Sequence, residues 1–205
     1  MIAATTTVAE VEIPISERGP SPRKVIVAYG FWLFLLSDII IFSALFAAYA
    51  VLAGQTAGGP GGQQLFHRGS VLVETGCLLM SSFTCAMMSL AVDVRHRGLM
   101  VIGAVLTLAL GAAFLWLEVS EFADMIAHGA GPSRSAFLSA FFALVGMHGL
   151  HVTIGLAWLV SMVAQVFTLG WRPLVVGRLA CFALFWHALD IVWIGVFTIV
   201  YLGAR

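Results

Sequence analysis

Pairs of ionisable residues interrupt the long apolar runs of this chain. His148 and His151 form one pair, and His187 and Asp190 form a second with the same spacing. Residues at positions i and i+3 project from one side of a helix, so each pair should present two polar side chains to a neighbour. Imidazoles and carboxylates in such a set can bond across helices, bind a metal ion, relay protons, or hold a lipid headgroup or a quinone. The spacing leaves all four interpretations open.

Four further carboxyl groups extend this polar set to two layers. Asp38 lies nine residues into the first apolar stretch, about 14 Å deep at the helical rise of about 1.5 Å per residue. The two pairs fall at a similar depth and predict, with Asp38, a polar layer near the middle of the membrane. Glu74 begins the second stretch, and Glu118 and Glu121 end the third, which predicts a second layer toward the outer face. Because an ionisable group facing acyl chains is costly, we expect all of them to face helix interfaces or a cleft.

The elements that carry these residues are predicted to be membrane helices. Hydrophobic residues make up 61% of the chain and charged residues 10%, which is typical of an integral membrane protein. Ten basic residues balance ten acidic ones, which gives no basic footprint for a nucleic-acid partner. The apolar runs lack the alternation of strands, and helices satisfy their own backbone in lipid. We therefore expect an all-α integral membrane bundle.

Five stretches are long enough to cross a hydrocarbon core about 30 Å thick, which takes roughly 20 helical residues. They cover residues 29–52, 71–92, 99–122, 137–167 and 178–202, within one membrane domain over 29–205. The fourth is longer than one crossing needs, so tilt or protrusion is expected. Residues 1–28 hold prolines and mixed charges without an apolar core, and we expect a flexible cytoplasmic tail there, not a cleavable signal peptide.

The placement of lysine and arginine predicts the orientation in the membrane. Cytoplasmic loops carry an excess of these residues. The tail and the second and fourth connectors share one side and hold seven of them: Arg18, Arg23, Lys24, Arg95, Arg97, Arg172 and Arg178. The other side holds three, Arg68, Arg134 and Arg205. This difference predicts a cytoplasmic N-terminus and, after five crossings, a periplasmic C-terminus.

Longer motifs surround the polar pairs in the last two stretches. The run FFALVGMHGLHVTIG at 141–155, followed by FWHALDIVWIGVFTIVYL at 185–202, resembles two consecutive helices of subunit III of the haem-copper respiratory oxidases. Residues 30–52 are similar to the helix that opens the short, five-helix form of that family, and WLEVSEF at 116–122 to a glutamate-bearing helix end. TAGGP at 56–60 and LVETGCLLMSS at 72–82 most resemble the cytochrome o ubiquinol oxidase branch.

This resemblance implies an accessory subunit without redox chemistry of its own. In the family, subunit I holds the haems and copper, and subunit III forms a V-shaped pair of helix bundles with phospholipid in the cleft. The chain is therefore expected to have no catalytic, cofactor-binding or metal-ligating residues. It would work in a bacterial inner-membrane complex that oxidises ubiquinol, reduces oxygen and pumps protons. Its expected partners are subunit I, the other oxidase subunits and membrane lipids.

The resemblance also assigns roles to individual positions. Asp38 stands where many members have a buried glutamate, so the stem is one methylene shorter here, and its expected role is to organise the cleft and the subunit contact. The histidine pair and the His187–Asp190 pair are then interpreted as polar bonds joining two adjacent helices. The predicted buried polar or lipid-cleft residues are Asp38, Glu74, Glu118, Glu121, His148, His151, His187 and Asp190.

Two other functions stay open at this point. One is the equivalent subunit of a cytochrome c oxidase, which an associated copper-site subunit with a cytochrome c docking face would favour. The other is a small proton-coupled transporter. A transporter would more often show an internal repeat and helices broken by glycine or proline, and neither is evident in the spans.

Overall fold

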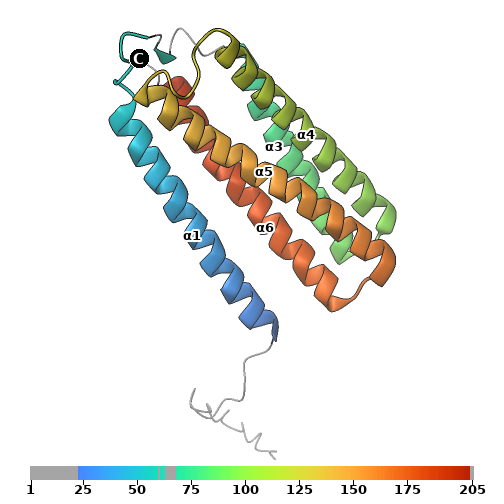
Figure 1. Cartoon of the computed structure of the whole chain (residues 1–205). Helices are drawn as coiled ribbons and strands as arrows, with labels where there is room; N and C mark the ends of the chain where they lie inside the picture. Colours follow the sequence, from blue (N-terminus) through green and yellow to red (C-terminus); the bar gives the residue numbers. More distant parts are fainter. Residues whose placement is uncertain (1–22, 60, 63–67, 204–205) are drawn as a thin grey trace, which may run out of the picture.

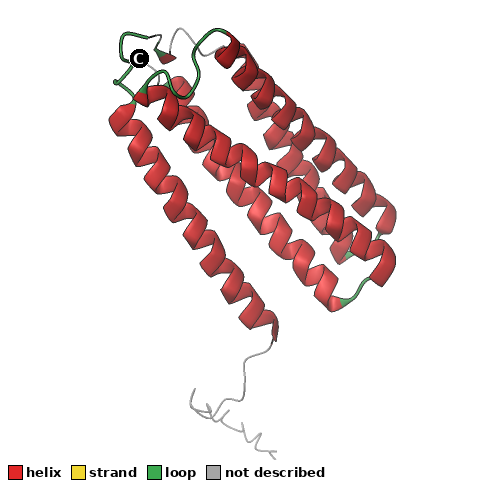
Figure 2. Cartoon of the chain, viewed as in Figure 1, coloured by secondary structure: helices red, strands yellow, loops and turns green. Residues whose placement is uncertain are grey.

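Five long helices make up most of the described chain (Figures 1 and 2). The structure, a computed structural model, describes residues 23–59, 61–62 and 68–203. In chain order the helices are α1 (Arg23–Leu52), α3 (Arg68–Asp93), α4 (Arg97–Ala127), α5 (Ala136–Leu169) and α6 (Pro173–Val196), and α6 continues as the π-helical segment η2 (Phe197–Leu202). All five are long and apolar enough to cross a membrane, and the described residues contain no strand. The predicted all-α, five-span architecture is confirmed.

Several helix boundaries differ from those expected from hydropathy. The first helix begins at Arg23, so residues 23–28 are helical and do not belong to a tail. The remainder of the predicted flexible tail, residues 1–22, lies outside the described residues. Helix α4 continues to Ala127 because Met125, beyond the predicted end, still packs in the core with 4% of its surface exposed. Hydropathy identifies the apolar middle of each helix, but it does not identify the polar turns at the helix ends.

Local sequence explains where three of the helices begin. The His96 side chain accepts a hydrogen bond from the backbone N–H of Leu99 at the start of α4, and Ser135 does the same for Leu138 at the start of α5. Each caps a backbone donor that the first helical turn leaves without a partner. Pro173 occupies the first turn of α6, where its missing N–H costs nothing.

Helices α5 and α6 lie side by side in the middle of the bundle. Helix α1 packs against them on one side, and α3 and α4 pack against them on the other (Figure 1). The most extensive helix contact joins α3 to α4, whereas α1 packs mainly on α5. The main packing between α1 and the α3–α4 pair therefore runs through α5 and α6.

One stripe of α1 faces the bundle. Leu35, Phe42 and Tyr49 are buried at intervals of seven residues, with 5%, 2% and 3% of their surfaces exposed. A seven-residue repeat keeps one face of a helix against its neighbour over its whole length. Asp38 lies three residues after Leu35 and four before Phe42, on the same stripe, while Ile40 on the opposite face is 69% exposed. Helix packing thus directs the carboxyl group of Asp38 toward α5.

Candidate functional site

The first polar contact of the bundle joins α1 to α5. Oδ1 of Asp38 lies 3.8 Å from Nε2 of His151, and only 15% and 14% of these side chains are exposed. Nδ1 of His151 lies 2.8 Å from the carbonyl oxygen of Met147, so it carries a hydrogen and donates it. Nε2 then faces Asp38 favourably only if the pair holds one further proton, on the imidazole or on the carboxyl group. Phe42 and Phe185 flank the imidazole with ring centroids 5.2 and 6.4 Å away.

His148 lies deeper, in the core between α4, α5 and α6. It is fully buried, and its Nε2 lies 3.3 Å from the carbonyl oxygen of Leu189 in α6. Its ring packs edge-on against Phe114 of α4, with centroids 5.6 Å apart, and lies tilted by 35° to the ring of Trp193 of α6, with centroids 5.0 Å apart. Nδ1 has no hydrogen-bond partner among the described residues. His148 therefore links α5 to the backbone of α6 inside an aromatic cage.

The third contact is a row of hydrogen bonds from α6 to α3. The indole N–H of Trp186 donates to Oγ of Ser81, and that of Trp193 donates to Oγ1 of Thr75, both at 3.1 Å. Beside the first of these bonds, Nδ1 of His187 lies 2.6 Å from Oγ of Ser82. In this α6–α3 row, hydroxyl groups of α3 accept hydrogen bonds from the N–H groups of buried aromatic rings of α6. Without these hydroxyl groups the N–H groups would have no partner.

The serine and threonine residues of this row were not predicted from the sequence. Serine and threonine in an apolar helix usually bond to the backbone of the same helix, so Thr75 and Ser82 carry no signal when each is taken alone. The spacing gives no signal either, because the donors Trp186 and Trp193 are seven residues apart whereas their acceptors Ser81 and Thr75 are six apart.

The carboxylate cluster, Glu74, Glu118 and Glu121, lies toward the end of the bundle where α3 begins and α4 ends. Its carboxyl groups are close enough to interact electrostatically. Glu74 is fully buried and Glu118 is 3% exposed, and both oxygens of Glu74 lack a hydrogen-bond partner among the described residues. The Glu118 carboxyl group packs on the backbone of Gly149 in α5, where an added Cβ would lie 2.7 Å from Oε1. Because the three groups share one buried region, the charge of each depends on the others.

Asp190 is the remaining predicted polar residue. It is 8% exposed, and neither carboxylate oxygen accepts a hydrogen bond within the described part of the chain. It lies on α6 three residues after His187, near Ser82 of α3, whose hydroxyl group bonds to the His187 ring. Ser82 can serve both neighbours when Nδ1 of His187 carries its hydrogen and donates it to Oγ, which leaves the Ser82 hydroxyl hydrogen for Asp190.

The two histidine-containing pairs do not converge on one point. His148 faces α6, His151 faces α1 and His187 faces α3, whereas the sequence indicated that the pairs join only two adjacent helices. Residues three apart on a helix differ by about 60° in direction at about 3.6 residues per turn, which is enough to reach different neighbours in a bundle. Among the described residues, no three His, Cys, Asp or Glu side chains are arranged to hold a metal ion. The geometry supports contacts that hold helices together.

Comparison with known proteins gives consistent matches over nearly the whole membrane part. Residues 21–204 match the family described as cytochrome c oxidase subunit III. The chain is 51% identical over 174 residues to cytochrome bo(3) ubiquinol oxidase subunit 3 of Pseudomonas aeruginosa, covering 85% of this chain and 83% of that protein. It is 42% identical over 173 residues to the protein of the same name from Buchnera aphidicola subsp. Baizongia pistaciae, with 84% and 89% covered. It is 44% identical over 176 residues to quinol oxidase subunit 3 of Bacillus subtilis, with 84% and 85% covered.

Proposed function

We propose that this chain, which belongs to the cytochrome c oxidase subunit III family, is the accessory subunit III of a bacterial bo-type ubiquinol oxidase. The observation that carries the proposal is the 51% identity to a bo(3) ubiquinol oxidase subunit 3 over 85% of the chain. The resemblance indicated by the HGLH and WHALD motifs is thereby confirmed. Relatives named as quinol oxidase subunits favour this function over a cytochrome c oxidase subunit and over a proton-coupled transporter.

In this proposal the chain supplies structure to the complex and takes no part in electron transfer. Subunit I holds the haems and copper, the complex uses ubiquinone, and this chain packs against subunit I and retains phospholipid. Support comes from the polar contacts, which connect α1 to α5, α5 to α6 and α6 to α3. Such interhelical bonds contribute about 0.6 kcal/mol each on average in a membrane protein, and they fix which helix faces are presented to neighbours.

The proposal includes an orientation in the bacterial inner membrane. The N-terminus lies in the cytoplasm and the C-terminus in the periplasm. Support comes from Arg95 in the α3–α4 turn, Arg97 at the start of α4 and Arg172 in the α5–α6 turn, because the guanidinium group of Arg97 lies beside Gly170 of that second turn. These arginines therefore gather at one end of the bundle, as the excess of basic residues in cytoplasmic loops requires.

Purification through a tag on this chain tests the assignment. In mild detergent the chain should carry with it a complex that shows haem absorption and quinol-dependent oxygen uptake. After dissociation, the haem and the oxygen uptake should remain with the other subunits. Haem or stoichiometric metal retained by the isolated chain would contradict the proposal. An active oxidase that lacks this chain throughout its purification would contradict it as well.

Asp38 has a supporting role in the same proposal, through its contact with His151. Replacing Asp38 by alanine removes the partner of Nε2 and loosens α1 from α5, so the complex should start at the normal rate of oxygen uptake and lose activity faster during turnover. Asp124→Ala is the matched control, because that carboxylate is 65% exposed and its ion pair within the described residues is with His128, four residues further along the same segment. Immediate loss of turnover in a fully assembled Asp38→Ala complex would refute a supporting role and indicate obligatory proton transfer.

A further inference from the structure

Three polar side chains follow one another from the interior of the bundle to its surface between α3 and α6. Asp190, 8% exposed, lies at the inner end, close to Ser82 of α3. Ser82 bonds in turn to Nδ1 of His187, which is half-buried. Nε2 of His187 has no hydrogen-bond partner among the described residues, and it is not one of the nitrogen atoms that they enclose. The polar series therefore ends on an imidazole nitrogen that faces out of the bundle.

His187 lies near the middle of its membrane span. It follows Pro173 by 14 residues and precedes Leu202 by 15, so about 21 Å of helix separates it from the nearer end at about 1.5 Å per residue. Lipid headgroups begin about 15 Å from the centre of the hydrocarbon core, which is too far to reach the ring. Acyl chains can reach it, but they offer Nε2 no hydrogen bond, and an ionisable group in that setting is costly. Nε2 therefore requires a polar partner from another membrane-embedded molecule.

Small residues surround His187 on the side toward the start of α6. We call the α3–α6 face the surface formed by Ser82, Ala86 and Ser89 of α3 and by Ala180, Ala183 and His187 of α6. The two helices run antiparallel, because Trp186 bonds to Ser81 and Trp193 bonds to Thr75. Both rows of small residues therefore extend from His187 in the same direction. Small residues let the backbone of another membrane helix approach closely, and hydrogen bonds between helices then hold it.

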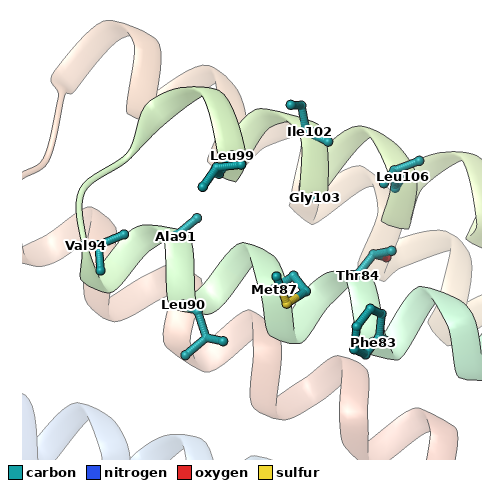
Figure 3. A pocket seen from close by; sticks show the side chains of 10 residues that line it. All are labelled: Phe83, Thr84, Met87, Leu90, Ala91, Val94, Leu99, Ile102, Gly103 and Leu106. Carbon is teal, nitrogen blue, oxygen red and sulfur yellow. The ribbon is translucent and has the colours of Figure 1, made fainter.

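The apolar groove between α3 and α4 lies beside this face and differs from it in chemistry (Figure 3). Thr84 is the one polar side chain among the described residues that line it, and Thr84 bonds to Thr107 inside the bundle. The groove thus gives a partner nothing polar to recognise. The α3–α6 face, by contrast, presents Nε2 of His187.

The polar series also defines what the partner must supply. If Asp190 is ionised, Ser82 donates to Asp190, Nδ1 of His187 donates to Ser82, and Nε2 is left as an acceptor. If Asp190 carries a proton, the direction reverses and Nε2 is a donor. A hydroxyl or carboxamide group can both donate and accept, so it suits Nε2 in either case.

We propose that the α3–α6 face is the docking surface for a transmembrane helix of a neighbouring oxidase subunit, with a hydroxyl or carboxamide side chain of that helix bonded to Nε2 of His187. The small residues admit the helix, and the imidazole fixes its register at the middle of the membrane. This inference rests on the proposed function, because the partner is a subunit of the oxidase. It adds the face that makes the contact and the chemistry that recognises the partner.

Photo-crosslinking in the complete oxidase tests the docking surface. The photoreactive residue p-benzoylphenylalanine replaces Leu184, which flanks the face and is 44% exposed, and the complex is purified through a tag on this chain. Irradiation should join this position to a membrane segment of another subunit, and that segment should hold a serine, threonine, asparagine or glutamine near the attachment site. The same residue in place of Val105, which is 55% exposed on α4, should crosslink to that segment several-fold less.

Two substitutions of His187 separate its outer bond from its inner one. Asparagine places an amide near the position of Nδ1 and can keep the bond to Ser82, whereas glutamine reaches the position of Nε2. His187→Asn should therefore release this chain from the complex in mild detergent roughly three- to fifteenfold faster than His187→Gln does. Replacing the crosslinked polar residue of the partner by alanine should speed release as much as His187→Asn does, and the two changes together should add little.

A bulky residue on the α3–α6 face tests the close approach of the helix. Ala86→Leu should speed release of this chain from the complex, because Ala86 lies in the row of small residues on α3. Ala109→Leu is the matched control, since Ala109 is exposed on α4, and it should leave the release rate unchanged. The comparison of the two His187 variants still tests the proposal if Ala86→Leu does not fold.

Three results would overturn the proposal while the assignment as subunit III stands. In a complex that retains its haem, crosslinks from the Leu184 position to lipid alone would mean that no helix docks there. Crosslinks to a quinone would mean that a small molecule occupies the face. Equal release of His187→Asn and His187→Gln would mean that Nε2 makes no contact. A tagged, unsubstituted chain that purifies without haem would instead contradict the proposed function itself.

Discussion

Replacing Gly149 by alanine tests the contact between α5 and the carboxylate cluster. The new Cβ would lie 2.7 Å from Oε1 of Glu118 and 3.2 Å from Cδ, closer than normal van der Waals contact. Glu118 is 3% exposed, so it cannot swing into open space. Forcing a methyl group into a packed site costs about 1–3 kcal/mol. Alanine is favoured over glycine in a helix by about 1 kcal/mol, which masks part of this cost.

A second glycine on the same helix cancels that masking effect. At Gly146 an added Cβ would meet only Cε2 of Phe122, at an ordinary 3.7 Å. Gly146→Ala therefore gains the same helix preference without the clash. The difference between the two variants isolates the contact with Glu118, and we expect Gly149→Ala to be the less stable by about 2 kcal/mol.

Thermal dissociation of the oxidase complex measures this difference. Loss of the tagged chain from the complex in mild detergent is followed as temperature rises, for the two alanine variants in parallel. A cost of about 2 kcal/mol in a chain of this size lowers the midpoint by about 4–8 °C. The cost should disappear in a Glu118→Ala background, because the clashing carboxyl group is gone. Equal midpoints for Gly149→Ala and Gly146→Ala, or an undiminished cost without Glu118, would refute the reasoning.

Two further substitutions probe helix contacts on α3. Ser82→Ala removes the hydroxyl group that bonds to Nδ1 of His187, and we expect a loss of about 0.6 kcal/mol, at most about 1.7, measured as a lower dissociation midpoint. Gly103→Ala should be more harmful, because the added Cβ would meet the backbone of Met88 at 3.0 Å and a backbone cannot rotate away. We expect α3 and α4 to separate, detected as increased protease cleavage in the turn between them.

Matched controls exist for both. Within the described part of the chain, Ser43 bonds to the carbonyl group of Ile39 in its own helix, and it is exposed, so Ser43→Ala should leave the midpoint unchanged. Gly76 lies on α3 with nothing within 4 Å of an added Cβ, so Gly76→Ala should be stable and resistant to protease. A Ser82→Ala midpoint equal to that of Ser43→Ala would show that the hydroxyl bond to His187 contributes nothing. Normal protease resistance of Gly103→Ala would show that the helices do not meet at that glycine.

The helices could be predicted from sequence, but their ends could not. Continuous apolar runs of about 20 residues have only one stable form in lipid, so the number of spans and the helical class followed directly. The ends depend on weaker local effects. The early start of α1 at Arg23 and the extension of α4 to Ala127 lie in polar turns, where hydropathy falls although the backbone stays helical.

The polar residues could be identified from sequence, but their partners could not. Ionisable groups such as Asp38 and His148 are conspicuous in apolar runs because each is expensive there. A hydroxyl group such as that of Ser82 is inexpensive, so its role as the partner of His187 was invisible before the helices were placed. Partner choice depends on the rotation of each helix about its axis, which a spacing of three residues constrains only loosely.

The sequence by itself determined that this protein is a five-helix membrane bundle with buried ionisable residues, and its motifs indicated the family. These properties follow from composition and from local periodicity, which act within one helix at a time. The tertiary structure decided that His151 pairs with Asp38, that His148 bonds to the backbone at Leu189, and that Gly149 leaves room for Glu118. Those contacts depend on how the helices are rotated and offset against one another, and that arrangement exists only once all five have packed.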